Sequence, residues 1–230
     1  LKYQIRTFVQ EDSVQKVLKK ELVEDGLLRF VFRYPTDNVN LSICEELPDS
    51  FNVMKVLSPR KDTISFYFTP VKDSLWISMS YDTINDTTHY SLKPRASVKP
   101  NRRRAKDETV RRLEVLGNAK GGRLKPEQPL ILSFKEPVVD VVMRDTMWFI
   151  DGKDTIFNDL RFSKVDEYGF IYKVEKKFEP EGKYKIIIPD SVFFGIRGLT
   201  NDTTKLDITV PEISQYGNIY ITVEVPENVP

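Results

Sequence analysis

Apolar residues alternate with other residues along most of the chain, and this period of two limits the fold more than any other feature of the sequence. Leu28, Phe30 and Phe32 occupy every second position of one segment, and Arg29 lies between the first two. A helix, with its period of 3.6 residues, would spread such residues around its whole surface. The alternation recurs at 64–68, 75–81, 130–134, 170–174, 184–188, 206–210 and 219–225. These segments are therefore predicted to be half-buried strands.

Short clusters rich in Pro, Gly, Asn and Asp separate the predicted strands. Examples are YPTDN at 34–38, GNAKGG at 117–122 and LTNDTT at 199–204. Residues of these types favour tight turns. Strands joined by tight turns at regular spacing are typical of antiparallel β-sandwiches. The predicted fold class is therefore all-β.

The chain also contains an internal repeat. LRFVFRYPTDNV at 28–39 and LILSFKEPVVDV at 130–141 each place a Phe three residues before a Pro. The tetrapeptide NDTT occurs at 85–88 and again at 201–204, each time followed by a last predicted strand. The same landmarks thus occur twice in the same order, which predicts two copies of one domain type.

A chain of 230 residues is long enough for two domains of about 100 residues each. Together with the repeat, this length predicts one β-sandwich at 1–94, a basic linker at 95–111 and a second β-sandwich at 112–213. Residues 214–230 are expected to be the first strand of a further domain. We therefore expect the sequence to begin and end inside a longer polypeptide.

Positive and negative charges are nearly balanced, with 35 Lys and Arg against 34 Asp and Glu. No overall field therefore attracts a polyanion or an anionic membrane. Eight basic and two acidic residues lie between Arg95 and Arg112, without an aromatic residue among them. A surface for single-stranded nucleic acid needs aromatic rings for the bases as well as charge. We interpret this run as a linker, with contact to an acidic surface or lipid head group as the alternative, and expect no nucleic acid among the partners.

The sequence contains no apolar run near the roughly 18 residues that a membrane-spanning helix needs. No membrane span is therefore expected within these residues, and a membrane anchor is expected in the part that precedes them. Cys44 is the only cysteine, which excludes an internal disulfide. It follows a short apolar run and is expected to pack as a small apolar residue.

Residues for catalysis or metal binding are scarce. His89 is the only histidine, and no nucleophile-elbow motif accompanies it. One His and one Cys are too few for zinc. The acidic turns at 81–88 and 151–154 lack the spacing of an EF-hand calcium loop. We therefore expect no enzyme, no catalytic residue, no cofactor and no metal.

The candidate binding residues are the two tryptophans, Trp76 and Trp148. Trp76 belongs to the opposite strand face from Leu75 and Ile77, so it is exposed if those two are buried. An exposed aromatic ring offers a flat platform for a sugar ring, although a sandwich also buries aromatic residues in its core. The alternative to a purely structural function is therefore a carbohydrate- or peptide-binding module that uses such residues or the groove between the domains.

The segments QPLILSFKEPV at 128–138 and FEPEGKYKIIIPDSVFFGIRGLTND at 178–202 resemble the bacterial Ig-like domain first described in surface-layer proteins, the SbsA type. The family shows an apolar strand ending in Phe-Ser-Glu-Pro-Val, then Pro, Gly, Tyr and an isoleucine-rich strand. Lys135 stands where the family commonly has serine, and Arg197 lies in a looser final turn. The resemblance implies two tandem Ig-like β-sandwiches.

Taken whole, the chain is similar to large Ig-like proteins of the Bacteroidetes, which are exported and often lipid-anchored lipoproteins. This resemblance implies a non-catalytic structural or adhesive function in the periplasm or at the cell surface. The expected partners are a glycan or another surface protein.

A dipeptide of Asp followed by Ser or Thr occurs repeatedly, each time before an apolar residue or Thr. This pattern resembles the sequon for O-glycosylation of exported proteins in the same phylum. The acceptor residues would be Ser13, Thr63, Ser74, Thr83, Thr87, Thr146, Thr155, Ser191 and Thr203. The competing interpretation is that Asp and Thr simply favour turns and strand edges.

Overall fold

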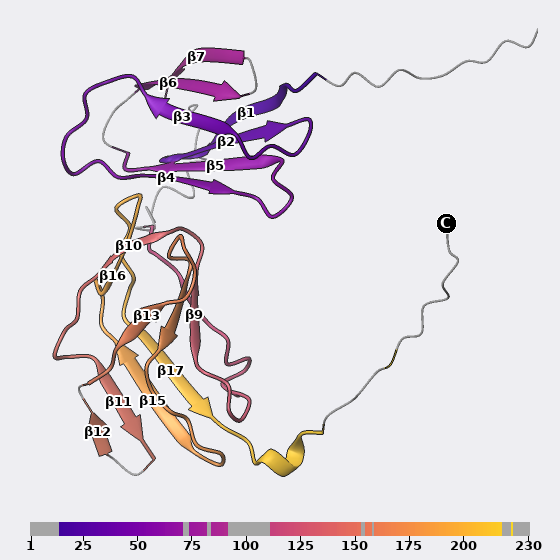
Figure 1. Cartoon of the computed structure of the whole chain (residues 1–230). Coiled ribbons are helices and arrows are strands. Elements are labelled where there is room, and N and C mark those ends of the chain that lie inside the picture. The colour runs from indigo at the N-terminus through magenta and orange to yellow at the C-terminus, as the bar shows by residue number, and fades with distance from the viewer. Residues whose placement is uncertain are drawn as a thin grey trace, which may run out of the picture. The chain divides into compact units, whose positions relative to one another are not determined.

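The computed structural model describes residues 14–70, 74–81, 84–91, 111–152, 155–157, 159–217 and 222. The chain divides into two compact units, each drawn in Figure 1. Unit 1 contains the residues up to Val110 together with Ile196–Gly198, and unit 2 contains the remaining residues from Arg111 onward. Only Arg111 of the predicted linker and Thr222 of the predicted strand at 219–225 are among the described residues.

Seven strands are described in unit 1: β1 (Val17–Glu24), β2 (Leu27–Phe32), β3 (Val39–Ile43), β4 (Val53–Leu57), β5 (Thr63–Phe68), β6 (Ser74–Tyr81) and β7 (Ile84–Ser91). They form two antiparallel sheets with the orders β1-β2-β5-β4 and β3-β6-β7. Lettered A to G in chain order, these sheets read A-B-E-D and C-F-G, which is the arrangement of a constant-type Ig domain. Figure 1 shows the two sheets as separate layers.

One apolar core lies between the two sheets of unit 1. Leu28, Phe30 and Phe32 of β2 belong to the same buried cluster as Leu75 and Ile77 of β6. Removing a side chain of this size from water stabilises the fold by about 1.5–3 kcal/mol. Because these residues occupy every second position of their strands, the alternation in the sequence leads directly to a sandwich.

The described strands of unit 2 are β8 (Val115–Gly117), β9 (Ile131–Phe134), β10 (Val138–Val141), β11 (Trp148–Asp151), β12 (Thr155–Phe157), β13 (Phe162–Lys164), β14 (Ile171–Val174), β15 (Lys183–Ile188), β16 (Phe193–Gly195) and β17 (Thr204–Thr209). They form the antiparallel sheets β13-β14-β9-β8 and β12-β11-β15-β17 and the ribbon β10-β16, and a 3-10 turn, η1 (Ile213–Gln215), follows. If β10, β12 and β16 are left out and the remaining seven strands are lettered A to G in chain order, the two four-stranded sheets again give the orders A-B-E-D and C-F-G. Unit 2 is therefore the same Ig topology with one added edge strand and one inserted ribbon.

The turn into β15 explains the closely spaced Gly and Tyr of the second half. The Tyr184 hydroxyl oxygen accepts a hydrogen bond from the backbone N–H of Glu179 at 2.8 Å. A Cβ atom on Gly182 would lie 2.4 Å from that hydroxyl oxygen, so a side chain at this position would displace the ring. A tyrosine whose hydroxyl bonds a few residues upstream at this corner is characteristic of Ig domains.

These observations confirm the prediction of an all-β fold with antiparallel Ig-like β-sandwiches. The core of unit 2 draws on both of its four-stranded sheets, as Leu132 of β9 and Ile186 of β15 show. Both side chains are fully buried.

The repeated tetrapeptide NDTT has a different structure in each unit. Residues 85–88 lie within β7, and their asparagine is exposed. Residues 201–204 lead into β17, and the Asn201 side chain is fully buried. Its Oδ1 accepts hydrogen bonds from the backbone N–H groups of Val192 and Phe193 at 2.9 and 2.8 Å. Its amide group donates to two backbone carbonyls, at 2.8 and 2.9 Å.

Candidate functional site

The outer surface of the sheet β3-β6-β7 in unit 1 brings a tryptophan and a histidine together. On β6, Leu75 and Ile77 point into the core, so Trp76 between them points outward. The strand register places Trp76 opposite His89 of β7. Among the described side chains of the three strands, the outward ones are Asn40, Ser42, Ser74, Trp76, Ser78, Ser80, Asn85, Thr87 and His89. We call this set the Trp76 face.

Trp76 is 47% exposed and belongs to β6, the central strand of its sheet. Its ring centroid lies 4.7 Å from that of His89, with an angle of 43° between the ring planes. Its backbone N–H donates to Glu45 Oε1, and its carbonyl accepts from the backbone N–H of Cys44, both at 2.9 Å. The indole is thus supported by a neighbouring ring while one of its surfaces stays open to solvent.

The nine described side chains of the Trp76 face include no Lys, Arg, Asp or Glu, although 30% of the chain is charged. Five carry a hydroxyl group and two carry an amide. The outer surface of the other sheet of unit 1 is different, because Glu21 forms ion pairs there with Lys19 and Arg29 at 2.5 and 3.8 Å. The Trp76 face therefore offers neutral hydrogen-bonding groups around an aromatic platform.

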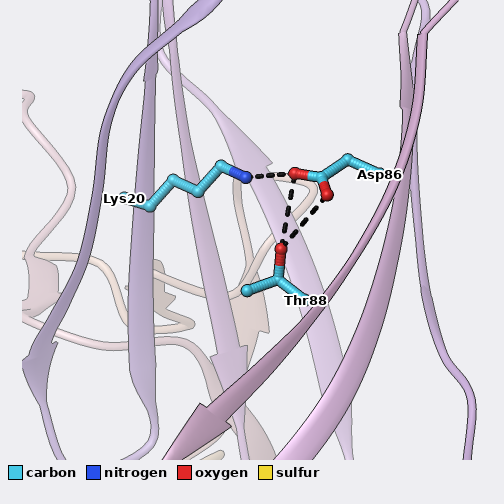
Figure 2. A network of polar contacts seen from close by, with 3 residues as sticks. All are labelled: Lys20, Asp86 and Thr88. Atoms are coloured by element: carbon cyan, nitrogen blue, oxygen red, sulfur yellow. Dashed lines mark hydrogen bonds and ion pairs between the residues drawn. The ribbon is translucent and has the colours of Figure 1, made fainter.

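An ion pair between Lys20 of β1 and Asp86 of β7 joins the two sheets of unit 1 (Figure 2). The Thr88 hydroxyl lies 3.3 and 3.4 Å from the two carboxylate oxygens. The hydrogen bond from Lys20 lowers the pKa of Asp86, and partial burial opposes this shift. Burial is the largest single influence on Lys20 and lowers its pKa, but the hydrogen bond to Asp86 and nearby charges together raise it above 10.5.

Trp148, the second candidate, lies on β11 of unit 2 and is 40% exposed. It pairs with Ile187 of β15. Lys185 and Asp207 lie on the same side of this sheet and form an ion pair at 3.4 Å. The surroundings of Trp148 are therefore charged, in contrast to those of Trp76.

The candidate O-glycosylation acceptors differ in exposure. Ser13 and Thr83 lie outside the described residues, Thr87, Thr146 and Thr203 are exposed, Thr63, Ser74 and Ser191 are half-buried, and Thr155 is the first residue of β12. Several of them begin strands. At the start of β5, for example, Asp62 Oδ1 accepts hydrogen bonds from the hydroxyls of Ser58 and Thr63 at 2.9 and 3.0 Å. The Asp-Thr pair at this position therefore also stabilises a turn.

The exposure of Cys44 contradicts the expectation that it packs as a small apolar residue. In β3, Leu41 and Ile43 are half-buried and Ser42 is exposed, so the period of two places Cys44 on the exposed side. His89 is likewise exposed, and its ring lies against that of Trp76 in a tilted arrangement. In the part of the chain that the structure describes, no group of three or more His, Cys, Asp or Glu is placed to hold a metal ion. Within the same residues no helix is long and apolar enough to cross a membrane.

A cavity of about 710 Å³ in unit 2 is lined by residues 127–129, 173, 175–180 and 213. Its lysines are matched by carboxylates. Lys173 pairs with Glu175 at 3.5 Å, and Lys177 pairs with Glu179 at 2.6 Å. Because its charges are balanced within the chain, this cavity does not indicate a charged ligand.

The first segment of unit 2 makes two isolated parallel contacts with the region of the last strand, one on each side of β8, which itself pairs with β9. Leu113 bridges Asn201, and Arg123 bridges Thr209, both in parallel orientation. The backbone hydrogen bonds run from Leu113 N–H to Thr200 O at 2.9 Å, from Leu124 N–H to Thr209 O at 3.1 Å, and from Thr209 N–H to Gly122 O at 2.7 Å. The entering segment is thus attached near both ends of β17.

No family model and no curated protein matches the chain. Among solved structures, domains 5–6 of the S-layer protein SbsC are 10% identical and align over 87% of this chain and 100% of that chain, with a TM-score of 0.27. Tandem Ig repeats of Dlar are 14% identical over 85% of this chain and 98% of that chain, with a TM-score of 0.26. At these identities and TM-scores the two structures support no statement about function.

Proposed function

We propose that the chain is a non-catalytic structural module whose Ig-like units act as a spacer that carries tension within a longer exported protein. The observation that supports this function is the parallel attachment of the first segment of unit 2 to β17. No enzymatic step is part of the proposal.

The direction of pulling decides how a pair of strands separates. Antiparallel neighbours pulled at the open end of a hairpin lose their hydrogen bonds one at a time. Parallel neighbours pulled from opposite ends slide past each other, so their hydrogen bonds share the load. Because the segment at 111–124 is the first part of unit 2 and β17 is its last described strand, tension along the chain loads the parallel contacts between them in shear. Unit 2 is therefore expected to resist extension.

Single-molecule force measurements on two pulling geometries test this function. Cysteine handles at Arg112 and Glu212 load the parallel pair in shear, whereas handles at Lys183 and Thr209 open the paired ends of β15 and β17. All four side chains are exposed, and a Cys44→Ser background removes the exposed native thiol. We expect a several-fold higher rupture force in the first geometry. Equal forces would contradict a load-bearing function, since forced unfolding reports the barrier along the pulled direction.

We also infer an extracytoplasmic location, in the periplasm or at the cell surface, and a lipid anchor in the preceding part of the polypeptide. The support is the resemblance of residues 128–138 and 178–202 to bacterial Ig-like domains of exported Bacteroidetes proteins. Protease treatment of intact cells tests the surface location, because a surface protein is cleaved before the envelope is broken. Metabolic labelling with a fatty acid tests the anchor.

O-glycosylation is a further part of the proposed function. Thr146 and Thr203 are exposed and so accessible to a modifying enzyme, whereas the Thr63 hydroxyl is half-buried and bonded to Asp62. Peptide mass spectrometry of the protein from its native host should therefore find glycan mass at Thr146 or Thr203 before Thr63. If the peptides containing the exposed acceptors all lack a glycan, O-glycosylation is ruled out, and the Asp-Thr pairs serve only to form turns.

Ligand binding through the Trp76 face is the second candidate function. The pairing of Trp76 with His89 on an uncharged surface favours it. Glycan and peptide are the two ligand classes that the sequence leaves open.

A further inference from the structure

We propose that the Trp76 face binds a neutral polysaccharide, with its sugar rings lying flat across β3, β6 and β7. This inference rests on ligand binding at the Trp76 face and goes further by naming the ligand class. It does not depend on the load-bearing function, which concerns unit 2.

The platform for the first sugar ring is Trp76. A pyranose presents C–H groups on its flat sides, and these pack against the electron-rich face of an indole. Because hydrogen bonds to Cys44 and Glu45 hold the backbone of Trp76 and His89 supports the ring, the platform is formed before the ligand arrives. A side chain with only two rotatable bonds also loses little conformational entropy on binding.

Hydrogen bonds to further sugar rings come from the rest of the face. Ser78 and Ser80 continue along β6, Asn40 and Ser42 lie beside them on β3, and Thr87 lies beside Ser78 on β7. Hydroxyl and amide groups both donate and accept hydrogen bonds, as sugar hydroxyls do. From Trp76 to Ser80 the strand covers roughly 13 Å, and the three strands span roughly 10 Å in width. The face is therefore large enough for a short stretch of polysaccharide.

The lack of Lys and Arg on the face favours a neutral glycan over an anionic one. The nine side chains include no Lys or Arg to pair with a carboxylate, sulfate or phosphate. The carboxylate of Glu45, which accepts a hydrogen bond from the Trp76 backbone, would repel such groups. An acidic polysaccharide would thus lose its hydration without gaining an ion pair.

The central position of β6 in its sheet favours a glycan over an extended peptide as the ligand. Peptides that add to a sheet need an open strand edge for their main-chain hydrogen bonds. β6 is the central strand, paired with β3 on one side and β7 on the other. Trp76 consequently offers a flat surface and not an edge.

Affinity electrophoresis and titration with soluble polysaccharides test the inference on the full 230-residue chain. The probes are neutral glucan, mannan and xylan, with polygalacturonate and hyaluronate as anionic probes and an extended peptide library as the third class. Protein from a host without O-glycosylation is needed, because a glycan on Thr87 would cover the face. Trp148→Ala is the matched control, since it removes a similarly exposed tryptophan from charged surroundings.

We expect at least one neutral probe to bind, and this binding to persist at high salt. Trp76→Ala should weaken it by at least about tenfold, and Trp148→Ala should change it by less than about twofold. Ser78→Asp, which keeps both rings but places a carboxylate on the face, should weaken it comparably. Circular dichroism verifies that each variant is folded.

The other outcomes overturn the inference in distinguishable ways. If only anionic polysaccharides or peptides bind, and Trp76→Ala abolishes that binding, the neutral-glycan inference is wrong while ligand binding at the Trp76 face stands. If no probe binds in a manner that depends on Trp76, both are wrong. In neither case is the load-bearing function affected.

Discussion

At the scale of single residues, Asn201 is expected to contribute more to the stability of unit 2 than its polar side chain suggests. Asn201→Ala leaves two buried backbone N–H groups, at Val192 and Phe193, without their acceptor. Each such group costs about 1–3 kcal/mol, so the free energy of unfolding of unit 2 should fall by about 2–6 kcal/mol. Urea denaturation followed by the fluorescence of Trp148, in a Trp76→Phe background, measures this change.

Asn85 provides the matched control, because it occupies the same position of the tetrapeptide NDTT in unit 1 but is exposed. Asn85→Ala should change the stability of unit 1 by less than about 0.5 kcal/mol. If both substitutions lowered the free energy of unfolding equally, the buried hydrogen bonds of Asn201 would not be the cause of its effect.

Burial of individual residues could be predicted from the sequence where a strand is long enough for its alternation to continue. Leu75, Ile77 and Met79 are all buried, and Trp76 between them is exposed. The same period of two, counted from Leu41 and Ile43, also places Cys44 outward, so the expectation that it is packed gave its apolar side chain more weight than its position. The two NDTT segments have the same sequence but different structures. Burial of Asn201 depends on its hydrogen bonds to the loop at 189–193, which the tetrapeptide itself does not reveal.

At the scale of strands, the ion pair between Lys20 and Asp86 is expected to make the stability of unit 1 depend on pH. The pKa of Asp86 is lowered on folding, so its contribution is present above the ordinary value of 3.8 and is lost as the pH falls through the lowered pKa. The pKa of Lys20 is raised, so its contribution is present below 10.5 and is lost as the pH rises through the raised pKa. The pair should therefore stabilise unit 1 across the neutral range.

Asp86→Asn should lower the free energy of unfolding of unit 1 by about 0.2–1 kcal/mol near neutral pH, because solvent screens a partly exposed pair. The difference from the parent should shrink in strong acid. Urea denaturation at several pH values, read from Trp76 in a Trp148→Phe background, measures it. Asp37→Asn, which removes the more exposed pair with Lys61, should have no measurable effect. A pH-independent difference for Asp86→Asn would rule out the ion pair as its cause.

The sequence predicts the positions of the strands better than it predicts which strands pair with one another. Trp76 could be identified as an outward residue from β6 alone. The neutrality of the surrounding face could not, because it depends on the register that places Ser42, Ser78 and Thr87 side by side across three strands. The ribbon β10-β16 is a similar case, since its two short strands lie more than fifty residues apart in the chain.

At the scale of the whole molecule, the repeat predicts two sandwiches because each copy supplies a complete set of alternating strands. Each unit indeed contains its own buried cluster, one including Phe30 and Phe68, the other Leu132 and Phe193. A domain boundary depends on more than this, because it requires that each cluster be stable without the rest of the chain. The boundaries at 94 and 112 thus remain a proposal.

Separate expression of residues 1–94 and 112–213 tests these boundaries. Each fragment contains a full A-B-E-D sheet and a full C-F-G sheet, so each should fold and unfold cooperatively on its own. The shorter fragment should be the less stable, because the fraction of surface buried on folding decreases with chain length. A fragment that ends at residue 180 serves as the control: it lacks β15 and β17, and thereby Ile186 and Ile208 of the core, and should not fold. If the complete fragments also fail to show cooperative urea transitions, the two sandwiches are not independent domains, and a spacer assembled from separable units would have to be abandoned.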